Sequence, residues 1–344
     1  MIKYNFSPGP AKLNNSVLEI VNKNIIEYQE EGVSILEISH RSDSFEKILE
    51  TTKKNLIELL KIPSNYQILF LQGGATFQNT FLGNNINQKK STSNLITGTW
   101  GQKTYEDFIQ IRDSKKILLE NNQILEFLNQ PLPDDIQNTD YMHITSNETI
   151  EGIQINNFNK IENDLIIDSS SDIGSYIFDW DNVAYLYAGA QKNLGIPGVT
   201  ISVVRDDFIE KNDNPTYLNL YKLINKDSLL NTPPTFAIYV LNLVTDWMLT
   251  MGGINYFERQ SIEYSSDVYA LLERYDNYVT LPVENSLHAG TVYYNMQIIP
   301  SSIAREVFCC KMGRAIRLTM ESGDFAMAYF FLGVSSCSGF TQAR

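Results

Sequence analysis

At 344 residues, 43% of them hydrophobic, the chain is long enough to bury a large core, and we expect two unequal lobes. A formal net charge of -13 argues against nucleic acid as its main partner. No apolar run reaches the length of a membrane span, and the first residues lack the apolar segment of a signal peptide. Three cysteines give neither a disulfide framework nor a zinc-binding spacing, so we expect a cytoplasmic protein without a metal site.

Hydrophobic periodicity predicts strands that alternate with helices along most of the chain. Helical spacing covers residues 17–26 and 45–60, and a helix opens at 77–82. The expected strands are 67–71, 94–97, 141–145, 164–167, 183–187 and 199–204. After a proline-containing break at 231–235, helices are expected over 236–251 and 254–275, before a weakly patterned tail. This alternation indicates an α/β fold with a mostly parallel sheet.

Three segments that follow predicted strands carry groups suited to binding a ligand. Gly73-Gly74-Ala75-Thr76 opens a helix, so its N–H groups and the Thr76 hydroxyl could hold a phosphate, although most such turns bind nothing. Trp100 stands in a loop of small residues, where it could stack on a planar cofactor or simply pack. Asn147-Glu148-Thr149 places a hydroxyl at the same edge, and a helix or turn cap is the simpler interpretation.

Asp168 and Lys192 together point to a pyridoxal phosphate site. Asp168 ends an apolar strand, and Lys192 follows the next strand, between small residues and a Gly-x-Pro-Gly turn. A lysine in this setting is suited to a Schiff base with the aldehyde, and the aspartate to the protonated ring nitrogen. Once released by a substrate amine, Lys192 would act as the base that moves the proton.

Several motifs resemble those of the phosphoserine aminotransferases, which belong to the class V group of fold-type I pyridoxal phosphate enzymes. The matching segments are Phe6–Ala11, Glu37–Ser42, Leu71–Gln78, Asn147–Gly152, Tyr187–Gly198 and Asn231–Phe236. The resemblance implies a seven-stranded, mostly parallel sheet in a large domain over 15–235. A smaller α+β domain would be formed by 1–14 and 236–344.

The resemblance also implies roles for individual residues. Lys192 would be the Schiff-base lysine, Asp168 the partner of the pyridine nitrogen, and Trp100 the stacking ring. Thr149 would lie near the 3-hydroxyl group. The remaining residues implied to bind the cofactor contact its phosphate: Ala75, Thr76 and Gln191 from one subunit, and Asn231 and Thr232 from the other. A homodimer with its sites at the subunit interface follows.

The residues implied to bind the substrate match the family motifs less closely than those implied to bind the cofactor. His40 and Arg41 match an anion-recognition loop contributed across the dimer, although the residues alone favour a solvated Arg41. Arg317 can be placed on the arginine that binds the substrate α-carboxylate, with Arg314 as a neighbouring alternative. Where the family has a His-Arg pair, this chain has Cys310 and Lys311, and Lys311 could supply a charge for the substrate phosphate.

The implied reaction is a transamination in serine biosynthesis. Glutamate donates its amino group and leaves as 2-oxoglutarate, and 3-phosphohydroxypyruvate becomes O-phosphoserine. Two alternatives remain: another fold-type I reaction such as a cysteine desulfurase, and a weakly active relative with an altered substrate end. Desulfurases usually carry histidine immediately before the lysine, and this chain has Gln191 there.

Overall fold

The computed structural model describes residues 9–119, 138–155, 157–158 and 161–273, together with the backbone of four short strands farther along the chain. Its centre is a seven-stranded sheet with the strand order β1-β9-β8-β7-β4-β2-β3. The strands are β1 (Tyr66–Leu71), β2 (Thr92–Ile96), β3 (Lys115–Leu118), β4 (Tyr141–Thr145), β7 (Asp164–Asp168), β8 (Val183–Gly189) and β9 (Thr200–Arg205). Only β9 runs against its neighbours, so the predicted mostly parallel seven-stranded sheet is confirmed.

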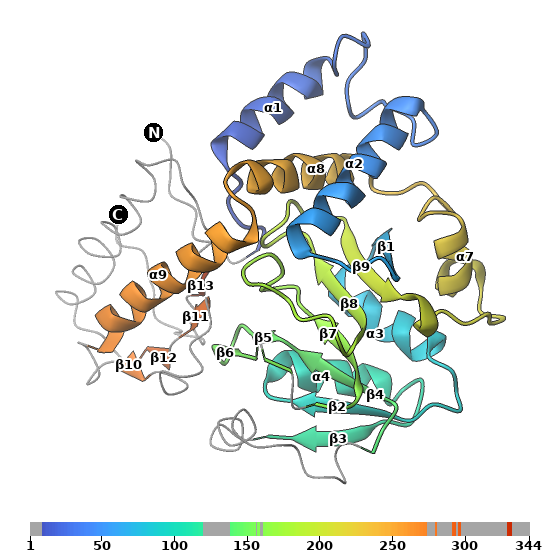
Figure 1. Cartoon of the computed structure of the whole chain (residues 1–344), viewed down its shortest axis with the longest axis vertical. Coiled ribbons are helices and arrows are strands. Elements are labelled where there is room, and N and C mark those ends of the chain that lie inside the picture. Colours follow the sequence, from blue (N-terminus) through green and yellow to red (C-terminus); the bar gives the residue numbers. More distant parts are fainter. Residues whose placement is uncertain are drawn as a thin grey trace, which may run out of the picture.

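Helices cover both faces of this sheet. The helices are α1 (Asn15–Ile26), α2 (Asp43–Leu60), α3 (Gly74–Asn85), α4 (Thr99–Phe108), α7 (Leu220–Asn225), α8 (Thr235–Thr250) and α9 (Ile254–Glu273). Figure 1 shows α1, α2 and α8 together at the top of the view. Their apolar side chains share one core with one sheet face, while α3, α4 and α7 share a second core with the other.

The remaining described strands are short. β5 (Asn147–Glu148) and β6 (Ile153–Gln154) form a small antiparallel pair directly after β4. Farther along the chain, β10 (Val279–Thr280) pairs with β12 (Asn295–Met296), and β11 (Thr291–Tyr293) pairs with β13 (Tyr329–Phe331). In Figure 1 these four strands lie beside α9, to the left of the main sheet.

Local signals in the sequence fix the ends of the first two helices. The Asn14 side chain accepts a hydrogen bond from the Ser16 N–H at 2.8 Å, which caps α1. Ser42 caps α2 in the same way, accepting from the Phe45 N–H at 3.3 Å. Lys61 then ends α2 in the left-handed conformation, with φ 56°. These two helices therefore begin and end within two residues of the predicted ranges.

The domain boundary expected at 235/236 stays a prediction, but the packing of α8 bears on it. Ile238, Leu241 and Val244 of α8 are buried in the core that α2 and the sheet also form. Helix α8, which the prediction assigns to the small domain, therefore packs directly into the core of the large domain. Within the described residues no single helix could span a membrane, although α8 and the start of α9, bent by 84°, meet the length and composition criteria as a pair.

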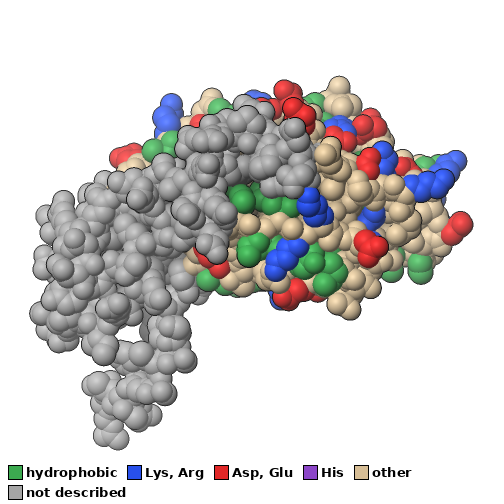
Figure 2. Space-filling view, turned by 90° about the horizontal axis from the view of Figure 1, so that it is seen from below, with side chains coloured by type: hydrophobic (Ala, Val, Ile, Leu, Met, Phe, Trp, Pro, Cys, Tyr) green, Lys and Arg blue, Asp and Glu red, His purple; other side chains and the backbone are tan. Residues whose placement is uncertain are grey.

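Figure 2 shows one face of the molecule, on which the described side chains carry charges of both signs. On the described part of that face, lysine and arginine side chains alternate with aspartate and glutamate, and hydrophobic side chains lie between them. At physiological ionic strength, salt largely screens interactions between such exposed charges beyond about 8 Å.

Candidate active site

The predicted site residues converge on the edge of the sheet where the parallel strands end. Leu71, at the end of β1, and Gly189, at the end of β8, both pair with Thr200 at the start of β9. Asp168, at the end of β7, pairs with Thr145 at the end of β4. In open α/β sheets, ligands bind outside the carboxyl ends of the strands. This edge is therefore the candidate site.

Lys192 lies in the connection between β8 and β9, and its side chain is largely buried. Burial lowers the pKa of Lys192, and the nearby carboxyl groups of Asp168, Asp172 and Glu148 oppose this shift. The Ala190 N–H donates to the Val199 carbonyl at 3.1 Å and closes the connection at its base. A buried lysine with a lowered pKa is suited to acting as a nucleophile and a base.

Residues 9–11 lie against the connection that carries Lys192. The Ala11 N–H donates to the carbonyl of Gln191 at 2.9 Å. A Cβ atom on Gly9 would lie 3.3 Å from Cγ of Lys192, which is a tight contact. A larger residue at position 9 would therefore push on the lysine side chain.

The Asp168 side chain is held in place by Ser170, two residues later. The Ser170 N–H donates to Oδ1 of Asp168 at 2.9 Å, and the Ser170 hydroxyl accepts from the Gly189 N–H at 3.2 Å. Burial raises the pKa of Asp168, while hydrogen bonding by the hydroxyl and the N–H of Ser170, and the charge of Lys192, act in the opposite direction. A cation placed against this carboxyl group would stabilise its ionised form.

Trp100 corrects one expectation, because it lies in the first turn of α4 and not in a loop. Trp100 is 37% exposed as a residue, and the Lys103 ammonium lies over its ring, 5.8 Å from the ring centroid. The indole N–H donates to the hydroxyl of Thr149 at 2.9 Å. Two residues expected at the cofactor, Trp100 and Thr149, are thus in direct contact.

Two carboxylates that the sequence did not single out bind the start of α4. Glu148 accepts from the N–H groups of Trp100 at 2.9 Å and Gly101 at 2.7 Å, and its side chain is fully buried. Glu151 accepts from the N–H of Thr99 at 2.9 Å. Burial raises the pKa of Glu148 to about 8, although both N–H groups lower it. The capping role considered for this segment belongs to its glutamate, not to Thr149.

The start of α3 suits a phosphate group. Gly73 precedes the helix at φ 95° and supplies no side-chain hydrogen bond to its first N–H groups. Ala75 and the exposed Thr76 lie in the first turn. The N-terminus of a helix of this length attracts anions through its free N–H groups and its dipole. These residues therefore fit the phosphate of pyridoxal phosphate.

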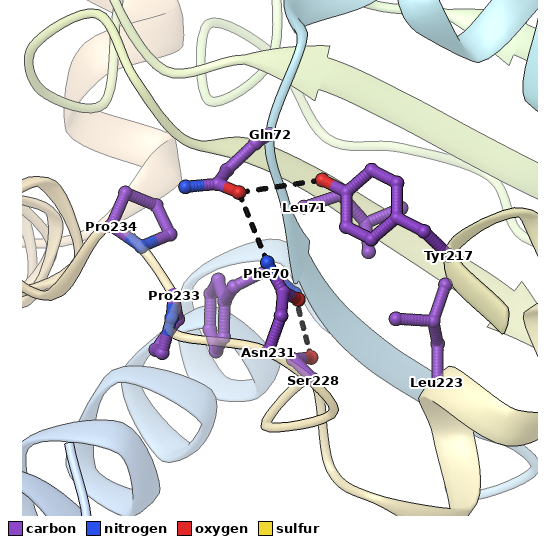
Figure 3. Close-up of a pocket in the computed structure, with 9 residues that line it drawn as sticks. All are labelled: Phe70, Leu71, Gln72, Tyr217, Leu223, Ser228, Asn231, Pro233 and Pro234. Atoms are coloured by element: carbon purple, nitrogen blue, oxygen red, sulfur yellow. Dashed lines mark hydrogen bonds between the residues drawn. The ribbon is translucent and has the colours of Figure 1, made fainter.

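Asn231 lies close to the start of α3 within the same chain. Figure 3 shows a small pocket in which the Asn231 amide donates to Oε1 of Gln72 at 3.3 Å, and Gln72 immediately precedes Gly73. Tyr217 donates to the same oxygen at 3.4 Å. Asn231 and Thr232 are both exposed, so their side chains are accessible to a second subunit.

The substrate residues are less well placed by the described structure. His40 is partly buried and Arg41 is exposed, in the connection that precedes α2. Among the described residues, no hydrogen bond or ion pair joins either side chain to the carboxyl edge of the sheet. Lys311, Arg314 and Arg317 lie outside the described residues, as do Cys309 and Cys310.

Asp172 is a further buried carboxyl group that sequence reasoning missed. It accepts hydrogen bonds from the hydroxyls of Ser146 and Ser169, each at 2.7 Å, and from the amide of Gln154 at 3.1 Å. Its position four residues after Asp168 could have drawn attention to it. Asp172 ties the ends of β4 and β7 together, which holds Asp168 in register.

Comparison with known proteins agrees with this geometry. A model of the family described as Aminotransferase class-V matches residues 3–317. The phosphoserine aminotransferases of Lactococcus lactis subsp. cremoris and Bacillus cereus are 36% and 38% identical to this chain. These matches span 83% and 82% of it, and 80% and 79% of the relatives.

Solved structures give the same result. The phosphoserine aminotransferase of Bacillus circulans subsp. alkalophilus superposes with a TM-score of 0.78 at 31% identity, over 93% of this chain and 88% of that one. The PLP-bound phosphoserine aminotransferase of Trichomonas vaginalis also has a TM-score of 0.78, at 25% identity, over 92% of this chain and 98% of its own.

Proposed function

Because the chain belongs to the Aminotransferase class-V family, we propose that it is a phosphoserine aminotransferase that uses pyridoxal 5'-phosphate. It transfers the amino group of glutamate to 3-phosphohydroxypyruvate, which gives 2-oxoglutarate and O-phosphoserine for serine biosynthesis. The observation that carries the proposal is the charge interaction between the largely buried Lys192, three residues beyond the end of β8, and Asp168, at the end of the neighbouring strand β7. The open N-terminus of α3 supports it.

When bound, the pyridoxal ring supplies an electron sink that makes the substrate α-proton acidic. The residues of this chain provide the rest. Lys192 holds the cofactor and later moves the proton, for which a lowered pKa of its amine is favourable. Asp168 would face the ring nitrogen and keep it protonated. Ala75, Thr76 and Gln191 would hold the phosphate group, while Trp100 and Thr149 would orient the ring.

The active form in this proposal is a homodimer in the cytoplasm. The exposed positions of Asn231 and Thr232, next to the start of α3, support a contact between subunits at this edge. The exposed Arg41, with His40, belongs to the same proposal as an anion-binding loop that reaches the partner's site. Lys311 and Arg317 complete the binding of two anionic substrates.

An absorption spectrum of the purified protein tests the proposal. Pyridoxal phosphate bound to Lys192 gives a visible band, and addition of glutamate should bleach it as the amino group moves to the cofactor. O-phosphoserine should bleach the same band, and 3-phosphohydroxypyruvate should then restore it. Lys192→Ala should lose the band and the turnover, whereas Lys226→Ala, on an exposed lysine after α7, should keep both.

The possible outcomes separate the alternatives. A band that glutamate leaves unchanged would refute transamination. Bleaching by glutamate without any response to O-phosphoserine would leave an aminotransferase with a different second substrate. Normal turnover by Lys192→Ala would refute the mechanism itself.

A further inference from the structure

The start of α4 is bound in an unusual way. A helix normally leaves its first N–H groups to a nearby cap residue or to water. Here the N-cap residue is Gly98, which has no side chain, and carboxylates from a segment about fifty residues later take that place. Glu151 binds the N–H and the hydroxyl of Thr99, and Glu148 binds the next two N–H groups.

The contacts of Glu148 use both oxygens of its carboxylate. Oε2 accepts from the N–H of Trp100, and Oε1 accepts from the N–H of Gly101. The adjacent Thr149 accepts from the indole N–H of the same tryptophan. Trp100 is therefore held at its backbone and at the far end of its side chain by two consecutive residues, which restricts the orientation of its ring.

Two glycines of α4 leave room for these carboxylates. A Cβ atom on Gly98 would lie 2.5 Å from Oε2 of Glu151 and 2.8 Å from Cδ of Glu148. A Cβ atom on Gly101 would lie 3.1 Å from Oε1 of Glu148. Since neither glycine has a positive φ, the space for Glu148 and Glu151 is the physical requirement for glycine here.

Burial of the Glu148 carboxyl group is costly because its polar atoms leave water, and this cost argues for a role beyond capping. Glu148 is fully buried, and Glu151 and Asp168 lie near enough to repel its ionised form. A serine or aspartate at position 98 could cap α4, and Glu148 would then not need to be buried. Glu148 differs from such a cap because the next residue, Thr149, also binds the indole N–H of Trp100.

We propose that Glu148 is a positioning residue, which together with Thr149 fixes the ring of Trp100 in the orientation needed to stack on the cofactor. This inference rests on the proposed function, because Trp100 is expected to contact the pyridoxal ring. Lys103 lies over the tryptophan ring in the described structure, and the exposed part of Trp100 is what remains for a ligand. Glu148 acts through Trp100 and touches no substrate in this proposal.

Glu148→Gln is the informative change. Its amide keeps the size of the side chain but has one acceptor oxygen, so an NH₂ group would face one of the two backbone N–H groups. We expect the dissociation constant for pyridoxal phosphate to rise about tenfold, because one buried N–H loses its acceptor. Glu106→Gln, which removes an exposed charge from the same helix, is the matched control and should bind as wild type.

A double-mutant cycle separates positioning from general damage to the fold. If Glu148 acts through Trp100, then Glu148→Gln should weaken cofactor binding in the wild-type background but have little further effect in Trp100→Ala. Equal effects in both backgrounds would overturn the proposal. Should Glu148→Gln fail to fold, Glu148→Asp, which keeps the charge but is one methylene shorter, replaces it in the same cycle.

The apoprotein provides a second measurement that does not depend on the cofactor. The contribution of Trp100 to the fluorescence is obtained by subtraction. The emission of the Trp100→Ala variant is subtracted from that of the same protein with Trp100, in both the wild-type and the Glu148→Gln background. Acrylamide should quench this difference more strongly in Glu148→Gln than in wild type, and equal quenching would overturn the proposal. If wild type binds no pyridoxal phosphate, the proposed function fails, and the apoprotein result still decides whether Glu148 orders Trp100.

Discussion

His143 should make the stability of the apoprotein sensitive to acid. It lies in the middle of β4, is 1% exposed, and shares a 2.9 Å hydrogen bond between its Nε2 atom and the hydroxyl of Tyr187. Burial lowers the pKa of His143 from 6.5 to about 3. The folded protein therefore keeps the ring neutral at pH values where the unfolded chain binds a proton.

The direction and the size of the pH effect on stability follow from the difference between the pKa values of His143 in the folded and unfolded states. A lowered pKa in the folded state means that stability is intact above pH 6.5 and is lost as the pH falls toward 3. In this window each pH unit costs about 1.4 kcal/mol. Between pH 7.5 and 5.5, the free energy of unfolding should therefore fall by about 1.4 kcal/mol because of His143 alone. The lower pH, 5.5, stays above the sequence pI of about 4.8, near which solubility is poor.

The assay is urea unfolding of the apoprotein at both pH values, followed by circular dichroism. His143→Gln keeps a side chain that can bond the Tyr187 hydroxyl but does not titrate, so its stability should fall by about 1.4 kcal/mol less than that of wild type. Glu148 and the other acidic groups contribute to both proteins and cancel in the comparison.

Tyr187→Phe provides a contrasting variant. It leaves His143 buried without its partner, so it should lose about 1–3 kcal/mol at both pH values and keep the acid sensitivity. Equal losses on acidification in wild type and His143→Gln would show that the buried imidazole does not control this response.

Three further changes probe the site and the core. Gly189→Ala would place a methyl group 2.4 Å from Oε1 of Gln191, the end of a flexible side chain, so the amide should move aside. We expect roughly tenfold weaker binding of pyridoxal phosphate, measured by titration, with little change in melting temperature; a large loss of stability would contradict this. Asp168→Asn should bind the cofactor but lower kcat by about 10²–10³-fold, and near-normal turnover would remove the ring-nitrogen role. Phe81→Ala empties a fully buried position under α3 and should lower the free energy of unfolding by about 3–5 kcal/mol in urea titrations, whereas a loss below about 1 kcal/mol would mean that the core collapses around it.

Strand ends were the part of the site that the sequence predicted well. Lys192 and Asp168 each follow a short apolar run, and parallel strands bring such ends to one edge whatever the details of packing. β3 was missed because it is four residues long, begins with two exposed lysines and lies at the edge of the sheet.

Contacts between distant segments could not be predicted in this way. The glycines on either side of Thr99 and Trp100 suggested a loop, because low helix propensity is their usual meaning in a sequence. Their actual role is to admit carboxylates from residues 148 and 151, and no periodicity relates those positions. The contacts of buried polar side chains such as Asp172 and His143 were likewise not predictable, because their partners come from other segments of the chain.

The antiparallel placement of β9 has a consequence for how the lysine reaches its position. Since β9 returns beside β8, Lys192 lies on a connection of ten residues whose two ends are hydrogen-bonded neighbours, and a parallel neighbour would require a much longer crossover. A short connection loses little chain entropy when it closes. The connection packs against α8, where Gly195 lies close to the backbone of Leu241. The short connection therefore fixes the backbone on both sides of Lys192, and its contacts with Leu241 and Ala11 join it to distant parts of the chain.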